Sequence, residues 1–300
     1  MPFVSVIVPA YNSAATVVEA VESALAQTVP AGEIVVVDDG SLDATAAIVR
    51  ERYPQVRLIE QANTGPAGAR NAGVRQARGE WIAFLDADDI WVPGRLERQM
   101  DCLNQCPDAV MLCGGRREFG ESVTLDPRPS CDRIAFREVT LDELARHNPI
   151  VTSTALVKRS AFDAVGGFDE QFRGPEDYDL WLRLAAQGRI FEMGEPLACY
   201  RHRPGSLSLD ERRFLPQVRR VLDKAFGPGG ALQGKSEWRH AALATQYQQA
   251  SWMAFSRGAR LPALRYLALA WAHNCRGPRR IVKPWLALLY RYAAGRPVTG

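Results

Sequence analysis

The chain has 300 residues, of which 47% are hydrophobic and 24% are charged, a balance typical of a folded globular protein. This length suffices for one large α/β domain with a smaller appendage, and the composition excludes a low-complexity or repetitive chain. The start lacks a basic segment followed by a long apolar stretch, so we expect no secretory signal. Charged residues interrupt every apolar run, so we also expect no membrane-spanning helix.

The net charge of +3 hides an asymmetry along the chain. Residues 201–300 contain 18 Lys and Arg against 4 Asp and Glu, whereas residues 1–200 contain 19 basic and 30 acidic residues. We therefore expect an acidic, metal-binding N-terminal part and a basic tail that meets an anionic partner. Nothing in the pattern indicates a nucleic-acid partner.

The six cysteines show no CxxC spacing, and no matching pair of histidines accompanies them, which argues against a structural zinc site. We expect free, mostly buried thiols, and a reducing cytoplasm fits such a chain.

Strand and helix patterns alternate through the first third of the chain. The expected strands, rich in β-branched residues, are 3–8, 33–37, 56–60 and 81–85, and the expected helices between them are 13–27, 43–52 and 66–77. Ser13 is a candidate cap for the first helix. This alternation predicts an α/β fold with a mostly parallel sheet flanked by helices, whose ligands bind beyond the carboxyl ends of the strands.

The pattern changes after about residue 115. Residues 116–148 are expected to be irregular, 151–157 and 190–200 to be strands, and 177–186 to be a helix, with a helical region beyond residue 205 that a linker at 227–230 interrupts. We expect one part at 1–115, a second part at 116–208, and a basic helical extension at 209–300.

Two acidic clusters follow expected strands. In extended backbone, Asp86 and Asp88 point the same way and can present carboxylates to one Mg²⁺ or Mn²⁺ ion; a solvated acidic turn is the alternative. Asp38 and Asp39 follow another strand and can accept hydrogen bonds from a base or a ribose, with ordinary turn chemistry as the alternative.

Two later motifs carry further candidates. Asp177, beside Glu176 at the expected start of a helix, is a candidate general base, although acidic residues also favour helix starts without any catalytic role. Farther on, Arg201, His202 and Arg203 suit a diphosphate, with His202 also a candidate metal ligand. A basic surface loop is the alternative there.

These motifs together resemble the inverting glycosyltransferases of family 2, which have the GT-A (Rossmann-like) fold. The resemblance covers about residues 3–208. The segments that carry it are Val-Ser-Val-Ile-Val-Pro-Ala-Tyr-Asn (4–12), Val-Val-Val-Asp-Asp-Gly-Ser (35–41), Gly-Ala-Arg-Asn-Ala-Gly (68–73), Gly-Glu-Trp-Ile-Ala-Phe-Leu-Asp-Ala-Asp-Asp (79–89), Gly-Gly-Phe-Asp-Glu (166–170), Glu-Asp-Tyr-Asp-Leu-Trp-Leu-Arg (176–183) and Tyr-Arg-His-Arg-Pro-Gly-Ser-Leu-Ser (200–208).

The resemblance implies that residues 1–115 form the nucleotide-sugar-binding half and residues 116–208 the acceptor-binding and catalytic half, and it implies a role for each motif. Asp177 would be the catalytic base, Asp88 and Asp86 would serve the metal, and His202 is a further candidate ligand. The donor would be held by Pro9, Tyr11, Asp38, Asp39, Arg70, Asp86 and Arg203. Many relatives carry a histidine where this chain has Arg203, and Arg203 is a candidate to supply a charge at the diphosphate instead.

The implied reaction moves a hexosyl or hexosaminyl group from a nucleotide-diphosphate sugar to an acceptor hydroxyl in one inverting displacement that needs Mn²⁺ or Mg²⁺. The resemblance favours a UDP-sugar, with thymidine and guanosine nucleotides open, and a saccharide or lipid-linked acceptor in surface polysaccharide or glycolipid synthesis. An inactive relative that serves as a membrane-associated assembly subunit stays a rival interpretation. A nucleotidyltransferase or a dehydrogenase fits less well, because residues 9–16 contain neither glycine nor a basic residue.

The tail beyond residue 231 falls outside the resemblance. Its aromatic and leucine residues lie among many arginines; they are Trp252, Phe255, Leu264, Leu267, Trp271, Trp285, Leu289 and Tyr290. This pattern predicts either helices that lie on an anionic membrane surface or helices that pack on one another. The first alternative would place the protein in the cytoplasm, peripheral on the inner face of the membrane.

Overall fold

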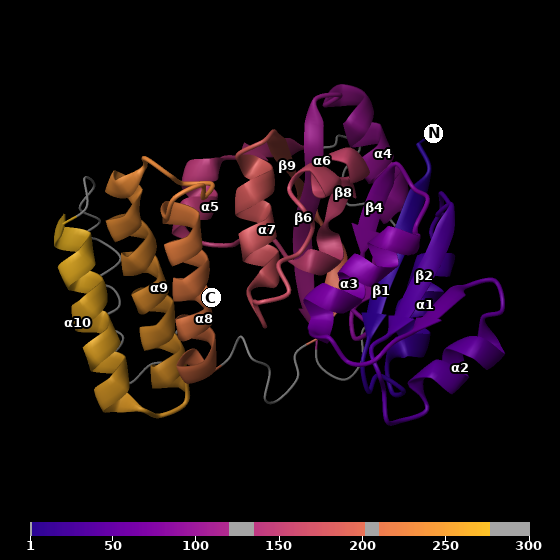
Figure 1. Ribbon diagram of the computed structural model, residues 1–300, viewed down its shortest axis with the longest axis horizontal. Helices are drawn as coiled ribbons and strands as arrows, with labels where there is room; N and C mark the ends of the chain where they lie inside the picture. The colour runs from indigo at the N-terminus through magenta and orange to yellow at the C-terminus, as the bar shows by residue number, and fades with distance from the viewer. Residues whose placement is uncertain (1, 120–134, 202–209, 277–300) are drawn as a thin grey trace. The chain divides into compact units, whose positions relative to one another are not determined.

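The computed structural model describes residues 2–119, 135–201 and 210–276. The chain forms two compact units (Figure 1). The first comprises residues 1–140 and 149–204, and the second comprises residues 141–148 and 205–300. Within the described residues, every helix is too short or too polar to cross a membrane.

The first unit is built on a mixed sheet with the strand order β3-β2-β1-β4-β8-β6-β9-β5, and β7 pairs with β9 at the side of this path. The strands are β1 (Val4–Ala10), β2 (Glu33–Asp38), β3 (Arg57–Glu60), β4 (Trp81–Phe84), β5 (Ile90–Trp91), β6 (Ala109–Phe119), β7 (Phe136–Val139), β8 (Leu156–Lys158) and β9 (Arg189–Arg201). The half formed by β3, β2, β1 and β4 is entirely parallel, whereas β8 runs antiparallel to both β4 and β6.

Helices cover both faces of this sheet. They are α1 (Val17–Leu25), α2 (Thr45–Arg52), α3 (Gly65–Gln76), α4 (Arg95–Gln105), α6 (Arg159–Ala164) and α7 (Glu176–Ala185). Even-numbered residues of β1, such as Val6 and Val8, join one apolar core with residues of α1, α2 and α4. On the opposite face, Phe84 of β4 contacts Phe162 of α6 and Phe168 edge-on or tilted, and Phe168 in turn meets Trp181 of α7. The predicted fold class, an α/β sheet flanked by helices, is therefore confirmed.

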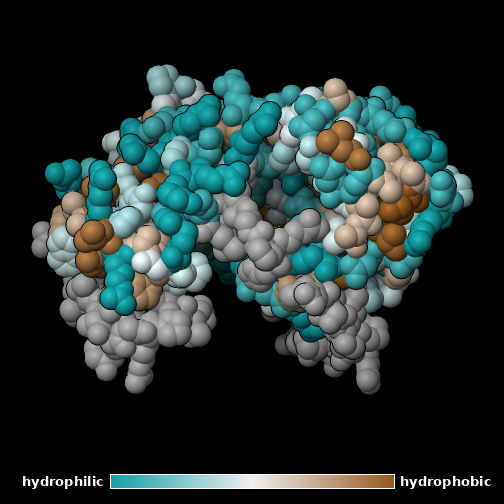
Figure 2. Space-filling view, turned by 90° about the horizontal axis from the view of Figure 1, so that it is seen from below, coloured by the Kyte–Doolittle hydropathy of each residue, from teal (hydrophilic) through white to brown (hydrophobic). Residues whose placement is uncertain are grey.

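The second unit is helical. It contains α5 (Leu141–Arg146), α8 (Glu211–Phe226), α9 (Ser236–Ser256) and α10 (Arg260–Arg276), of which α8, α9 and α10 run side by side (Figure 1). Their common core is formed by Leu215, Tyr247, Ala250, Leu267 and Ala270. The helical extension and its break at residues 227–230 are thus as predicted. On the face seen in Figure 2, hydrophilic residues separate the small apolar patches of both units.

Three local predictions were wrong. Residues 116–148 are not irregular throughout, because β6 continues to Phe119 and β7 and α5 follow. Helix α1 begins at Val17, and the Ser13 hydroxyl donates to the Tyr11 carbonyl instead of capping the helix. The expected strand 151–157 consists of a 3-10 turn, η1 (Thr152–Thr154), followed by β8, since side chains rather than a neighbouring strand hold the carbonyls of the turn.

The close approach of α3 to the sheet gives a test of this packing. A Cβ added at Gly73 would lie 2.5 Å from Ile7 Cγ2 in β1. We expect Gly73→Ala to lower the free energy of unfolding by about 1–3 kcal/mol despite the better helix propensity of alanine. Urea titration checks this, with Arg75→Ala, at an exposed position of the same helix, as the control. A stabilised Gly73→Ala protein would contradict the packing.

Candidate functional site

The loops after β1 and β2 are joined to each other at the carboxyl edge of the sheet. The Asn12 backbone N–H donates to Ser41 Oγ at 2.9 Å, and the Asn12 Oδ1 atom accepts from the Leu42 N–H at 2.8 Å. Asn12 has a φ of 48°, a left-handed conformation that asparagine tolerates better than most residues. Tyr11, just before it, is 49% exposed, so its ring is available at this edge.

The two carboxylates at the end of β2, Asp38 and Asp39, are both buried but have different hydrogen-bond partners. Asp39 accepts hydrogen bonds from the backbone N–H groups of Thr64 and Gly65 at 2.9 and 2.8 Å, which holds the start of α3 against β2. Asp38 accepts from the Ser41 N–H through Oδ2, whereas its buried Oδ1 has no hydrogen-bond partner among the described residues. Asp38 is therefore the one of the two with an unused acceptor.

Three carboxylates follow β4. Asp86 and Asp88 are half-buried, and Asp89 is 1% exposed. Burial, together with the negative charges of Asp86 and Asp88, raises the pKa of Asp89 to about 8. The loop thus concentrates negative charge at the end of a buried strand.

The turn η1 ties this acidic loop to α7. Ser153 Oγ accepts from the Asp86 N–H at 3.1 Å and donates to Asp89 Oδ2 at 2.5 Å. Its neighbour Thr152 donates through its hydroxyl to Asp177 Oδ2 at 3.3 Å. One short turn therefore contacts both the acidic loop and the candidate base.

Arg95 of α4 holds η1 in place through hydrogen bonds to backbone carbonyls. Its guanidinium is fully buried and donates to the carbonyls of Ser153 and Ala155 at 2.7 and 2.9 Å, while Gln99, one turn along α4, donates to the Thr154 carbonyl at 3.1 Å. The cation also lies 3.8 Å from the centre of the Trp91 ring. Burial lowers the pKa of Arg95 well below its ordinary value. These contacts explain why residues 152–154 form a turn.

A second buried arginine joins the acidic loop to the start of α7. Arg70 of α3 donates to Asp86 Oδ1 at 2.7 Å and to Glu176 Oε1 at 2.8 Å, and Phe168 covers the guanidinium at 5.4 Å. Burial alone would lower the pKa of Arg70, but the charges of Asp86 and Glu176 raise it above its ordinary value. Arg70 is thus a permanent cation that fixes two carboxylates on different elements.

Asp177 lies beside this bridge, in the first turn of α7. Burial, and next the negative charge of Glu176, raise the pKa of Asp177 to about 7, while Arg70 and hydrogen bonds from Tyr178 and Thr152 oppose the rise. A carboxylate with a pKa near neutrality can accept a proton at physiological pH and release it again.

The basic motif begins at the end of β9, on the far side of the acidic loop. The Arg201 N–H donates to Asp89 Oδ1 at 3.0 Å, and its guanidinium donates to the Asp88 carbonyl at 2.9 Å. His202 and Arg203, the two other candidates of this motif, lie outside the described residues.

The donor set after β4 fits a hard divalent cation. Asp86 and Asp88 offer carboxylate oxygens, the ligands that Mg²⁺ and Mn²⁺ prefer, and their charge adds to the effect of burial in raising the pKa of Asp89. A cation bound there would relieve this local excess of negative charge. Groups of three or more His, Cys, Asp or Glu side chains in metal-binding positions do not occur within the described part of the chain.

The structure therefore brings Asp86 and Asp177 together through Arg70 and η1, and it joins the loops that contain Tyr11 and Asp38. Pro9 lies half-buried near the end of β1. Sequence reasoning missed the structural contributions of Ser153 and Arg95. Their neighbours in sequence look like an ordinary strand and an ordinary charged helix, so only the three-dimensional contacts reveal them.

Comparisons with known proteins identify relatives of this chain. Residues 5–166 match the model of the family described as "Glycosyl transferase family 2". The succinoglycan biosynthesis protein ExoO of Rhizobium meliloti is 38% identical over 248 residues, which cover 79% of this chain and 71% of that protein. The chain spans a smaller share, 61%, of uncharacterised glycosyltransferases from Rickettsia prowazekii and Rickettsia typhi.

Two solved structures have similar folds. The mannosyltransferase PcManGT of Pyrobaculum calidifontis, solved with GDP-Man and Mn²⁺, has a TM-score of 0.62 and 25% identity, and the match covers 98% of this chain and 80% of that one. S. aureus TarS 1–349, solved with UDP-GlcNAc, has a TM-score of 0.57 and 19% identity, with coverage of 98% and 92%. The second likeness supports the fold alone.

The Arg70 bridge gives a direct test of the site's architecture. Arg70→Met leaves Asp86 and Glu176 without their shared cation, so we expect a loss of about 3–5 kcal/mol in the free energy of unfolding. Arg75→Met, on the exposed side of the same helix, should change it by about 0.5 kcal/mol or less. Urea unfolding of both variants measures this. Equal losses would show that Arg70 is not the bridge described.

Proposed function

The chain belongs to glycosyl transferase family 2, and on that premise we propose that it transfers a hexosyl or hexosaminyl group from a nucleotide-diphosphate sugar to an acceptor hydroxyl with inversion. The observation that carries the proposal is the Arg70 bridge, which joins Asp86 of the acidic loop to the helix start that bears Asp177. The bridge thereby fixes the proposed leaving-group site, at Asp86, relative to the helix start that bears the proposed base.

In this proposal the nucleotide lies over the ends of β1 and β2. The exposed Tyr11 ring can stack on the base, and the half-buried Pro9, two residues earlier in the same segment, would line the same site. The unpartnered Asp38 Oδ1 can accept a base N–H or a ribose hydroxyl. Asp39 acts indirectly, because its carboxylate already holds the start of α3. Uridine remains our preferred base.

The sugar diphosphate lies at the acidic loop. Asp88 and Asp86 would hold Mn²⁺ or Mg²⁺ there, and the cation would neutralise charge that develops on the departing diphosphate. Arg70 orients Asp86 through a hydrogen bond of 2.7 Å. Arg203 would add positive charge at the diphosphate, and His202 is a second candidate ligand of the cation.

Asp177 then acts on the acceptor. A sugar hydroxyl is a poor nucleophile until its proton is being removed, and Asp177, with its pKa raised to about 7, is suited to accept that proton. Thr152 holds the carboxylate through Oδ2. The attack and the departure of the diphosphate occur on opposite faces of the anomeric carbon, so the configuration inverts without a covalent intermediate on the protein.

The acceptor is a saccharide or a lipid-linked saccharide of surface polysaccharide or glycolipid synthesis, a class consistent with the name of ExoO. A peripheral position on the inner membrane face is supported by Leu261 and Leu264 of α10, which are 81% and 50% exposed and lie beside the exposed Arg260 and Arg265. Trp285, Leu289 and Tyr290 lie outside the described residues.

The assignment of the base predicts a specific kinetic change. Asp177→Asn should retain donor affinity and lose about 10²- to 10⁴-fold in kcat, because the amide cannot accept the proton. Release of nucleotide from a sugar donor measures kcat, and calorimetry measures donor affinity. Asp163→Asn, at an exposed position, is the control. Near-normal turnover in the Asp177 variant would remove Asp177 from the base role.

The pH dependence gives a second test of the same residue. Asp177 is active when deprotonated, so kcat should rise with pH through about 7 and then level off. Since the negative charge of Glu176 contributes to the raised pKa, Glu176→Gln should move this rise to lower pH. A rise that stays at the same pH in Glu176→Gln would refute the electrostatic explanation.

The metal assignment predicts that Asp88→Ala abolishes Mn²⁺-dependent binding of the nucleoside diphosphate and leaves the fold intact. Calorimetric titration with UDP, dTDP and GDP, each with Mn²⁺ and with chelator, measures this. Asp101→Ala, at an exposed position of α4, should bind as the unaltered protein does. Tight nucleotide binding that a chelator does not change would rule out the proposed role of Asp88.

The membrane proposal predicts that Leu261→Ser and Leu264→Ser together weaken cosedimentation with vesicles that contain anionic lipid, because both remove apolar surface that would enter the interface. Leu42→Ser removes a leucine of the first unit that is even more exposed, at 89%, and should have no effect. If the double variant sediments as the unaltered protein does, α10 does not contact the membrane through these residues.

A further inference from the structure

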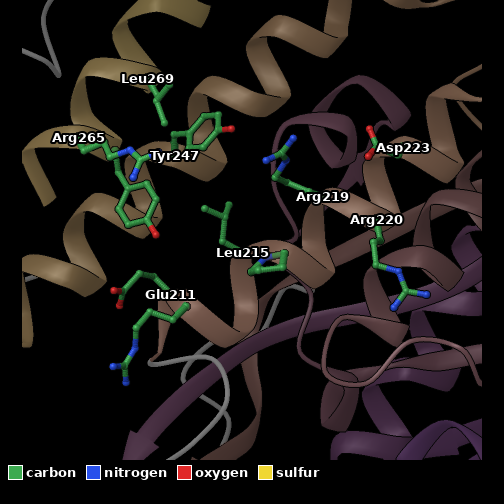
Figure 3. A pocket seen from close by; sticks show the side chains of 11 residues that line it. Glu211, Leu215, Arg219, Arg220, Asp223, Tyr247, Arg265 and Leu269 are labelled. Atoms are coloured by element: carbon green, nitrogen blue, oxygen red, sulfur yellow. The ribbon is translucent and has the colours of Figure 1, made fainter. Parts of the chain in front are cut away.

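The C-terminal helices enclose a pocket that the transfer reaction described above does not use. Its volume is about 620 Å³, within the range of small-molecule sites, and its walls come from α8, α9 and α10. In Figure 3, Tyr247 of α9 and Arg265 of α10 lie on one side of Leu215 and Arg219 of α8 lies on the other, with Arg220 farther away.

The pocket presents hydrogen-bond donors that the described part of the chain leaves unused. Arg219 and Arg265 have no carboxylate and no hydrogen-bond acceptor among the described residues, and the same holds for the hydroxyls of Tyr247 and Tyr266. Tyr247 is only 8% exposed, so its ring belongs to the core while the residue still lines the pocket. Two guanidinium groups and two phenol groups from α8, α9 and α10 therefore line the pocket without a hydrogen-bond partner among the described residues.

The two carboxylates of the lining do not neutralise these arginines. Glu211 is paired with Arg257, and Asp223 is paired with Arg239 at 2.6 Å, and neither of these two partners belongs to the lining. Arg219 and Arg265, both exposed, are thus left as positive charges in the lining of the pocket. An anionic group, a carboxylate or a phosphate, is the complement that such guanidinium groups bind best.

The two tyrosines of the pocket indicate which class of ligand bears the anionic group. The Tyr247 ring is stacked with the rings of Tyr266 and His273, with ring centres 6.4 and 5.6 Å apart. The ring thus already has two stacking partners within the protein, which disfavours a ligand that binds by stacking, such as a nucleobase. The hydroxyls instead suit a ligand rich in oxygen atoms along its length.

We propose that this pocket binds an acid-bearing oligosaccharide, with Arg219 and Arg265 on its carboxylate or phosphate and the hydroxyls of Tyr247 and Tyr266 on its sugar oxygens. The choice of a saccharide rests on the proposed transferase function, in which this site would hold a segment of the acceptor or product. The anion-binding part rests on the pocket alone.

Calorimetric titration of the full chain with tetragalacturonate, maltotetraose and inorganic pyrophosphate tests the proposal. We expect tetragalacturonate to bind at least about tenfold more tightly than maltotetraose, since one free arginine contact to an anion is worth about 1.5–3 kcal/mol. Arg219→Gln and Arg265→Gln should each weaken tetragalacturonate binding by about tenfold or more. Arg213→Gln, at an exposed position of α8 outside the lining, is the matched control.

Three outcomes would overturn the proposal: no binding of tetragalacturonate, equal binding of maltotetraose, or equal weakening by Arg213→Gln. Tyr247→Phe distinguishes the source of the anion, because it should weaken tetragalacturonate binding and leave pyrophosphate binding unchanged. Pyrophosphate that binds as tightly as the oligosaccharide would refute the saccharide part. Nucleotide binding in the same samples reports separately on the transferase site, so the two proposals can fail independently.

Discussion

The buried Arg70 guanidinium is the contact on which the site depends. It joins Asp86, at the end of a central strand, to Glu176, at the start of α7, two residues 90 positions apart in the chain. An isolated charge would be costly in this interior, and each carboxylate offsets that cost only while the other elements stay in place. The bridge therefore couples the packing of α3, the acidic loop and α7 to one another.

The same bridge sets the electrostatic conditions for Asp177. Burial and the charge of Glu176 raise its pKa, and Arg70 opposes them, so that the carboxyl has a pKa of about 7. Arg95 contributes differently, through backbone carbonyls rather than carboxylates, and fixes the turn from which Thr152 and Ser153 reach Asp177 and the acidic loop. Two buried arginines thus act on the site in different ways. Arg95 holds the turn that contacts Asp177 and the acidic loop, and Arg70 opposes the rise in the pKa of Asp177.

Much of this architecture was predictable from sequence. The short runs of β-branched residues marked β1, β2 and β4, and the polar or acidic residues at their ends could be assigned to one edge, because parallel strands end together. The strand predicted at 151–157 was wrong at residues 152–154, since the contacts that turn these residues come from Arg95 and Gln99, more than 50 positions away. The sequence also could not predict that Asp38 and Asp39 have different hydrogen-bond partners, because two neighbouring carboxylates are equivalent until the fold places donors next to them.

The central claim is that Asp177 is the sole protein carboxylate that reacts, as the base of a single displacement. The most direct measurement is the anomeric proton of the first-formed product, followed by NMR from a donor of known configuration. The account predicts a product of opposite anomeric configuration to the donor. A product that keeps the donor's configuration would require a second displacement, and it would contradict the assignment of Asp177 as the base.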